Sequence, residues 1–230
     1  MEYLEFERIL STNRMQRYKD AANGDTRKAM ALYRYNLRLS QEMFTIVSCF
    51  EVALRNAIDS LLVPNLGDDW LKDSVQDNGI FSNGRMNETR KIIEKAYNRL
   101  NRQGIYSHSK LIAEMEFGVW KYMYSSLQYR ATGQCLLRAF PNKPRSSTAV
   151  QYNNTYMFNE LDKVNSLRNR IAHHEPICFR LHASEIDTSY IVNEYQKIQT
   201  LFSWMDIDSR SMLYGLDHIQ SICSKINTLK

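Results

Sequence analysis

Glycine and proline are scarce in this sequence, with 8 and 4 residues among 230, and only 4 cysteines are present. The cysteines, at positions 49, 135, 178 and 223, lie far apart and form no C-x-x-C pair. This spacing argues against zinc fingers and thiol redox motifs. Scattered thiols are typical of a reducing compartment, so we expect a cytoplasmic protein.

Long apolar runs and a leader segment are missing as well. A membrane-spanning helix needs about 18 consecutive apolar residues, and the longest candidate, residues 43–54, is interrupted by Thr45, Ser48 and Glu51. The first eight residues, MEYLEFER, contain acids where a signal peptide has a basic start and an apolar run. We therefore expect a soluble protein with no membrane partner.

The charge balance is only mildly basic, because 30 Lys and Arg against 25 Asp and Glu give a net charge of +5. Such a charge permits a polyanionic partner without requiring one. The 14 tyrosines could stack on unpaired RNA bases, but composition alone favours ordinary half-buried positions in helices. The bulk composition therefore leaves the partner open.

The sequence shows no strand-like alternation and no internal repeat, and helix-forming residues are abundant, which predicts an all-α fold. We expect one domain over residues 1–230, with a core at about 26–204 and additional helices at both ends. The expected helices span about 3–21, 26–62, 88–102, 109–129, 152–175, 184–204 and 209–227, with a polar linker at about 68–87 and a loop at about 141–147.

The longest expected helix has clear start and stop signals. Asp25 is a suitable N-cap, and Pro64 and Gly67 should stop the helix. Apolar residues recur at helical spacing and predict one buried stripe: Met43, Val47, Phe50, Leu54, Ile58 and Leu61.

One segment, residues 161–176 (LDKVNSLRNRIAHHEP), carries side chains with catalytic chemistry. Four apolar residues share one helix face and should point into the core: Leu161, Val164, Leu167 and Ile171. Ser166, Asn169 and His173 form a polar stripe on roughly the opposite face, with Asn169 and His173 as neighbours four residues apart. Arg168 points about 140° away from His173. It must therefore bend round, act from the edge of this face, or meet the histidine of a second subunit.

An arginine, an asparagine and a histidine suffice for cutting RNA without a metal, because the RNA 2′-hydroxyl is a built-in nucleophile. Histidine side chains can change protonation state near neutral pH, so a histidine at position 173 can accept or donate the required proton. Arg168 can bind phosphate oxygens with its planar fork. Asn169 can hold the imidazole or a phosphate oxygen by hydrogen bonds. The products would be a 2′,3′-cyclic phosphate and a 5′-hydroxyl end.

Spacing alone leaves other interpretations open. Arg168 could make a surface ion pair, and His173 could simply be favoured at a helix C-terminus by the dipole. Metal binding by His173, His174 and Glu175 is a further interpretation. Adjacent helix residues diverge, however, and no distant Cys or His cluster completes a metal site, so we expect no metal and no other cofactor.

A family resemblance narrows these alternatives. Residues 168–176 (RNRIAHHEP) resemble the R-N-x-x-A-H-H-E signature of the abortive-infection (Abi-like, AbiD/AbiF) proteins, which belong to the HEPN superfamily of helical ribonucleases. Residues 50–58 (FEVALRNAI) resemble that family's E-x-x-L-R-N helix. Residues 116–124 (EFGVWKYMY) resemble its central F-G-x-x-x-x-x-Y segment, and residues 159–167 resemble the lead-in to the signature. The motifs cover about residues 30–180, in the family's order.

The resemblance implies an all-α, HEPN-like helical bundle with extra N- and C-terminal helices. It also implies a metal-independent endoribonuclease toxin of a bacterial abortive-infection, or phage-defence, system. Arg168 and His173 match the catalytic pair, and Asn169 matches the polar residue between them. Related HEPN ribonucleases usually dimerise so that two such motifs face one cleft, which would also bring Arg168 to a histidine. The expected partners are therefore RNA as substrate, a second copy of the chain, and a restraining non-coding RNA or protein.

Further residues are candidates for supporting roles or for RNA binding. If the helix of residues 50–58 packs beside the motif helix, Glu51 would orient Arg168 or Arg55, and Arg55 and Asn56 would contact phosphate. The other supporting candidates are Arg170, His174, Glu175, Lys143 and Arg145. A basic N-terminal surface could also bind RNA, although a charged helix face is more often just solvated; it comprises Arg8, Arg14, Arg17, Lys19, Arg27, Lys28, Arg34 and Arg38, with Tyr18, Tyr33 and Tyr35.

The alternative from a different class is a non-catalytic helical module for RNA binding or dimerisation, because some HEPN-like domains have lost their chemistry. The intact Arg168, Asn169 and His173 favour the enzyme. A binder would hold RNA without changing its length.

Overall fold

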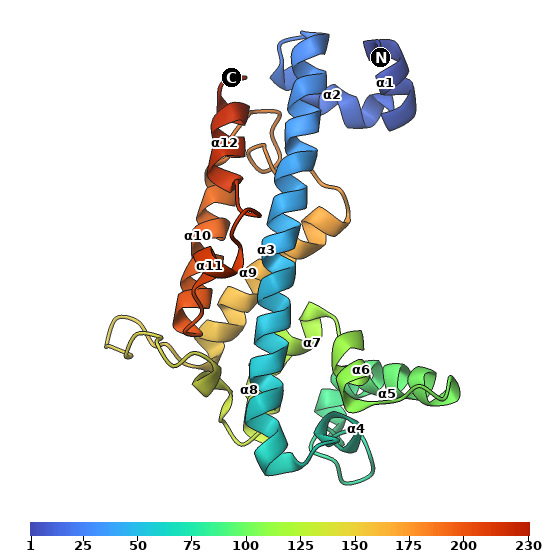
Figure 1. Cartoon of the computed structure of the whole chain (residues 1–230), viewed down its shortest axis with the longest axis vertical. Helices are drawn as coiled ribbons and strands as arrows, with labels where there is room; N and C mark the ends of the chain where they lie inside the picture. The colour runs from blue at the N-terminus through green and yellow to red at the C-terminus, as the bar shows by residue number, and fades with distance from the viewer. The chain divides into compact units, whose positions relative to one another are not determined.

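The computed structural model describes residues 1–230 and consists of helices joined by loops (Figure 1). The only strand-like pairing is an isolated antiparallel bridge between Phe179 and Ile186, so the all-α prediction is confirmed. No helix is both long enough and apolar enough to cross a lipid bilayer. The α-helices are α1 (Tyr3–Leu10), α2 (Thr12–Ala21), α3 (Thr26–Leu66), α4 (Trp70–Asp73), α5 (Asn87–Arg102), α6 (His108–Glu114), α7 (Phe117–Tyr122), α8 (Ser126–Ala131), α9 (Asn154–Ala172), α10 (Ser189–Trp204), α11 (Ser209–Met212) and α12 (Ile219–Asn227), and the 3-10 helices are η1 (Gly84–Met86) and η2 (Leu136–Ala139).

The chain divides into two compact units. The first unit comprises Met1–Ser48, Ser166–Thr200 and Asp208–Lys230, and the second comprises Cys49–Asn165 and Leu201–Ile207. Helices α3, α9 and α10 each contribute residues to both units. The segment from Arg168 to His173 belongs to the first unit. The expectation of one domain with a core at about 26–204 stays a prediction.

Apolar faces of three helices supply much of the first unit's core. Burying an aliphatic side chain of this kind contributes roughly 1.5–3 kcal/mol. Asp25 caps α3 as predicted, because its carboxylate accepts the backbone N–H groups of Arg27 and Lys28 at 2.9 and 3.0 Å. Buried residues recur at helical spacing: Leu32, Leu39 and Met43 on α3, Ile191 and Ile198 on α10, and Ile219, Ile222 and Ile226 on α12.

Residues 3–21, which the sequence predicts as one helix, form two helices separated at Ser11. Ser11 has a φ of 78°, and its hydroxyl accepts the backbone N–H of Arg14 at 3.4 Å. On one straight helix Tyr3 and Met15 would point about 120° apart, whereas the break allows both to be buried. The prediction of a single helix is therefore wrong here, and the burial of both side chains gives the physical reason.

Asn36 is a buried polar residue on α3, with 3% of its surface exposed. Its side-chain oxygen accepts the backbone N–H of Ile177 at 2.9 Å and that of Cys178 at 3.2 Å. Both hydrogen bonds are buried, and a buried N–H group without an acceptor lowers the stability of the fold. Asn36 therefore fixes the path of the chain directly after the segment from Arg168 to His173.

Aromatic side chains form the centre of the second unit. The ring of Phe50 on α3 lies 6.3 Å from that of Phe117 on α7 and packs edge-on against Phe202 of α10 at 5.3 Å. All three rings are fully buried. Phe50 and Phe117 belong to two of the segments that resemble the family motifs, so the fold brings these two segments together.

The helix expected at about 109–129 is instead divided into α6, α7 and α8. The backbone is extended at Met115 and Glu116, with ψ of 128° and 160°, and again at Ser125, with ψ of 155°. On a single helix Ile112 and Phe117, five residues apart, would point about 140° apart. The break turns both into the interior, where Phe117 is 0% and Ile112 is 4% exposed.

Other helix boundaries also differ from the prediction. Helix α3 continues past Pro64 to Leu66 and ends where Gly67 adopts a φ of 90°, a conformation that glycine takes without strain. The predicted apolar stripe is buried from Met43 to Ile58, but Leu62 rather than Leu61 completes it. The helix expected at 209–227 is two helices, α11 and α12, with Gly215 at a φ of 76° between them.

We predict that Asn36→Leu lowers the free energy of unfolding by about 2–4 kcal/mol, because two buried N–H groups lose their acceptor. Asn193→Leu is the matched control, since Asn193 is exposed on α10 of the same unit, and its effect should stay within about 0.5 kcal/mol. Urea denaturation followed by far-UV circular dichroism measures both. Equal small effects would show that Asn36 does not hold the chain.

Candidate functional site

Helix α9 presents the motif side chains at its C-terminal end. Leu161, Val164 and Leu167 are at most 1% exposed and Ile171 is 7% exposed. The predicted polar stripe of Ser166, Asn169 and His173 is exposed. The predicted division of this helix into an apolar and a polar face is therefore confirmed.

His173 directly follows the last residue of α9 but keeps helical spacing. Its backbone N–H donates to the carbonyl oxygen of Asn169 at 2.9 Å, so its side chain lies one turn beyond that of Asn169. The imidazole is exposed and makes no hydrogen bond or ion pair within the chain. By contrast, the rings of His108 and His218 pair with Asp59 and Glu42 at 2.8 and 3.2 Å. His173 is therefore available to exchange a proton with a ligand.

Arg168 is half-buried beside this exposed stripe. Its Nη1 lies 3.5 Å from Oδ1 of Asn169, at the outer limit of a hydrogen bond. Its Nε is buried and has no hydrogen-bond partner. Because guanidinium groups bind anions through several N–H donors, Arg168 retains the capacity to bind a phosphate.

The turn after α9 is a Schellman motif. The backbone N–H of Glu175 donates to the carbonyl oxygen of Arg170, and that of His174 donates to Ile171, both at 2.9 Å. His174 has a φ of 55°, in the left-handed region where such turns usually place glycine. The backbone of His174 thus ends the helix, while its neighbour His173 presents a free side chain.

Arg170 and Glu175, both candidates for RNA binding, hold each other across this turn. Nε of Arg170 lies 3.2 Å from Oε2 of Glu175, and its Nη2 donates to the carbonyl oxygen of Pro176 at 3.1 Å. The guanidinium carbon also lies 5.1 Å from the centre of the Tyr190 ring. These contacts give both residues a structural role, and their contact with RNA stays a prediction.

Two arginines of α2 bind the chain that follows the motif. Nη1 of Arg14 donates to the carbonyl oxygen of His174 at 2.9 Å. Arg17 donates to the carbonyl oxygens of Arg180 and Ala183 at 2.9 and 3.0 Å. The N-terminal helices are therefore part of the framework that positions the motif.

The basic N-terminal surface is thus partly used by the protein itself. In addition to Arg14 and Arg17, the Lys19 ammonium lies 5.7 Å from the Tyr3 ring and the Arg34 guanidinium lies 5.2 Å from the Phe6 ring. Tyr18 and Tyr33 are buried and do not offer faces for base stacking. This region supports the fold, and a role in RNA binding rests on its remaining exposed cations.

Of the two positioning residues, Asn36 is absent from the candidates that the sequence singles out, and Arg14 appears there only as part of the basic N-terminal surface. Asn36 carries a usable signal, because it is a polar residue between the buried Leu32 and Leu39 on an apolar helix face. Arg14 carries none, since exposed arginines are common on helices. Its partner is a backbone carbonyl 160 residues further along the chain.

The cysteine nearest to His173 in the sequence, Cys178, is not available as a nucleophile. Cys178 lies five residues after His173, but burial raises the pKa of its thiol to about 12. It therefore stays protonated at neutral pH and cannot act as a thiolate nucleophile. No group of three or more His, Cys, Asp or Glu side chains is arranged to hold a metal ion.

The remaining predicted residues belong to the second unit. On α3, Glu51 and Arg55 are half-buried and Asn56 is exposed, and Nε of Arg55 is buried without a hydrogen-bond partner. In the loop before α9, Lys143 is half-buried and Arg145 is exposed. The motif belongs to the first unit, so the expectation that Glu51 orients Arg168 stays a prediction.

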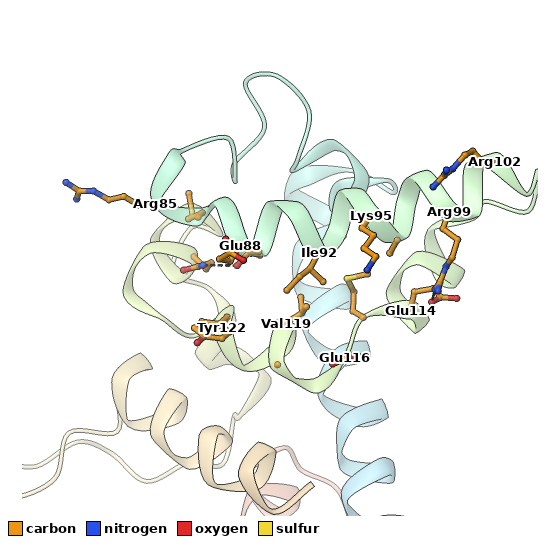
Figure 2. Close-up of a pocket in the computed structure, with 16 residues that line it drawn as sticks. Arg85, Glu88, Ile92, Lys95, Arg99, Arg102, Glu114, Glu116, Val119 and Tyr122 are labelled. Carbon is orange, nitrogen blue, oxygen red and sulfur yellow. Dashed lines mark hydrogen bonds and ion pairs between the residues drawn. The ribbon is translucent and has the colours of Figure 1, made fainter. Parts of the chain in front are cut away.

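The second unit also contains a cavity of about 690 Å³, lined by residues from η1 and α5 to α8 (Figure 2). Figure 2 shows Ile92 of α5 opposite Val119 of α7, with Lys95 beside them and Arg85 directed away from the cavity. Arg99 forms an ion pair with Glu114 at its edge. No residue of the 168–173 segment lines this cavity, which therefore belongs to a different feature of the molecule.

We predict that His174→Gly changes the free energy of unfolding by less than about 1 kcal/mol, because glycine tolerates a left-handed backbone. His174→Val should lower the free energy of unfolding by at least about 1 kcal/mol, since a β-branched residue is strained in that conformation. Urea denaturation compares the two variants. Equal stability of the valine and glycine variants would argue against the Schellman turn.

Comparison with known proteins identifies a matching family. A family model described as Abi-like protein matches residues 2–178. The match covers well over half of the chain and includes residues 2–30, where the sequence shows no motif. No curated protein and no solved structure matches the chain. On the strength of this match, which spans the segment from Arg168 to His173, the chain belongs to the family of Abi-like proteins.

Proposed function

We propose that the protein is a metal-independent endoribonuclease of the HEPN type that acts as a toxin in abortive infection. Membership of the Abi-like family associates the chain with abortive infection and phage defence. The observation that carries the enzymatic proposal is the exposed, unpaired imidazole of His173, one helical turn from the exposed Asn169. Arg168 on the same helix end supplies a half-buried guanidinium beside the exposed polar stripe.

In the proposed reaction the RNA provides its own nucleophile. The 2′-hydroxyl oxygen attacks the adjacent phosphorus, a base takes the hydroxyl proton, and the bond from phosphorus to the 5′-oxygen breaks as that oxygen gains a proton. His173 performs the proton transfer. Arg168 binds the phosphate oxygens, whose charge develops in the transition state. The products are a 2′,3′-cyclic phosphate and a 5′-hydroxyl.

Asn169 is placed to assist without transferring a proton. Its side chain is exposed and lies one turn before His173 on the same face. Its amide can donate to a phosphate oxygen and accept from the imidazole. Asn169 would therefore set the orientation of the imidazole relative to the phosphate.

A second copy of the chain completes the proposed site. Arg168 and His173 are five residues apart, so a helical backbone directs their side chains about 140° apart. Two copies that bring their α9 ends to one cleft would place Arg168 of one copy beside His173 of the other. Such a cleft would also offer one histidine as base and one as acid.

A toxin of this kind needs a restraint during normal growth. In the proposal, a non-coding RNA or a neighbouring protein holds the enzyme inactive in the bacterial cytoplasm. Release of this restraint would allow RNA cleavage and stop growth or phage replication.

We predict that the purified protein cuts RNA in EDTA and that His173→Asn lowers the cleavage rate at least about 100-fold, because asparagine cannot exchange the proton. His182→Asn is the matched control, since His182 is also exposed in the first unit and has a φ of 60° that asparagine tolerates. Gel analysis of cellular RNA after expression of each variant tests catalysis and substrate class together. An undiminished His173→Asn variant would show that another residue transfers the proton, and RNA held but left uncut would favour the binding module.

We also predict that two inactive variants complement each other. Arg168→Ala and His173→Ala, each without activity alone, should regain part of the cleavage activity when they are mixed and allowed to exchange subunits. In the mixed dimer one copy supplies an intact Arg168 and the other an intact His173. Co-purification of two differently tagged variants from the mixture provides the control for exchange. Mixed dimers that stay inactive would place both residues of a site in one copy.

A further inference from the structure

Three aromatic side chains form a cluster at the start of α9 and the end of α10. The ring centre of Tyr152 lies 4.8 Å from that of Tyr156 and 5.6 Å from that of Trp204, and Tyr156 lies 6.2 Å from Trp204. All three residues belong to the second unit and are half-buried. The chain's other tryptophans, Trp70 and Trp120, are buried at 1% and 0% exposure. The cluster thus presents aromatic surface to solvent that the core aromatics do not.

A basic loop is attached to this cluster at both of its ends. The backbone N–H of Asn142 donates to the carbonyl oxygen of Trp204 at 3.0 Å, and the hydroxyl of Ser146 accepts the backbone N–H of Tyr152 at 3.0 Å. Lys143 and Arg145 lie between these two attachment points. Figure 1 draws this loop directly before α9. Two cationic residues therefore lie in a loop that is attached to the half-buried aromatic cluster.

All charged residues in the sequence around this loop are basic. No Asp or Glu occurs from residue 117 to residue 159, although the whole chain contains 25. Lys121 is buried in an ion pair with Asp162, whereas the other cations of this stretch make no ion pair: Arg130, Arg138, Lys143 and Arg145. Asp206 accepts a hydrogen bond from the Asn142 side chain at 2.8 Å, which helps to hold the loop. The loop itself contributes no negative charge that would repel a phosphate.

Aromatic rings beside a loop with unpaired cations suit one class of ligand. Unpaired bases stack on Tyr and Trp faces, and Lys and Arg neutralise the phosphates that link those bases. A duplex keeps its bases stacked on one another and cannot use such rings. We propose that Tyr152, Tyr156 and Trp204, with Lys143 and Arg145, form a platform that binds single-stranded RNA. This proposal rests on the proposed function and names the substrate class, which is RNA with unpaired bases.

Tryptophan fluorescence gives a direct readout, because Trp204 is the only tryptophan that is not fully buried. Titration with a single-stranded 2′-O-methyl RNA, which lacks the free 2′-hydroxyl and cannot be cut, should quench the emission. Trp204→Phe should abolish the quench yet retain binding, since phenylalanine still stacks. A duplex of the same sequence should bind more weakly and cause no quench.

Ring removal tests the platform itself. Tyr152→Ala should weaken binding of the single strand about 5- to 100-fold, whereas Tyr152→Phe, which keeps the ring, should bind like the parent. Tyr214→Ala is the control, because Tyr214 is 90% exposed and belongs to the first unit.

Removal of a loop cation tests the contact with phosphate. Arg145→Ala should reduce the salt dependence of binding by about one phosphate. Arg102→Ala is the control, because Arg102 is also exposed.

The outcomes separate this proposal from the proposed catalysis. Binding that is unchanged in Tyr152→Ala and Arg145→Ala, with folding verified by circular dichroism, would overturn the platform even if His173→Asn abolishes cutting. Equal binding of single strand and duplex would overturn it too. Loss of single-strand binding in Tyr152→Ala together with full cutting by His173→Asn would support the platform and overturn the catalytic assignment.

Discussion

The position of the segment from Arg168 to His173 depends on how buried backbone N–H groups find acceptors. Asn36 accepts two such groups from Ile177 and Cys178, and this fixes the chain immediately after the motif. The Schellman turn at His174 and the carbonyl contact with Arg14 fix the residues just before. His173 directly precedes this turn, and its side chain is exposed and makes no hydrogen bond or ion pair within the chain. The fold therefore holds the backbone firmly while it leaves the imidazole exposed.

Periodicity predicts much of this architecture, because apolar residues at helical spacing identify a buried face without reference to other segments. The burial of Leu167 and Ile171 and the exposure of Asn169 and His173 follow from this rule alone. The positions of the helix breaks do not follow from this rule. Neither Ser11 nor Met115 is a strong helix breaker, and the chain turns there because side chains on both sides of each break are buried. Tertiary burial outweighs local propensity at these points.

The contacts that support the site also cannot be predicted from the spacing of residues along the sequence. Asn36 and its partner Ile177 are 141 residues apart, and Arg14 and His174 are 160 residues apart. The conformation of His174 is hidden as well, because helices usually end on glycine and the sequence R-I-A-H-H-E contains none. A family resemblance identifies Arg168 and His173, but only the structure shows that Arg170 and Glu175 pair with each other. Within one motif, Arg170 and Glu175 therefore have a structural role, whereas catalysis by Arg168 and His173 is a proposal.

An exposed histidine without a partner is incomplete as a general base. In most such sites a third group orients the imidazole and selects its tautomer, yet His173 makes no hydrogen bond within its own chain. The orienting group must then come from Asn169 after a small rearrangement, from the bound RNA, or from a second copy. In the proposed enzyme, the last two sources would make activity depend on assembly. A base that is ordered only in the assembled complex would leave a lone chain inactive, and this would suit the proposed toxin, which its host must tolerate.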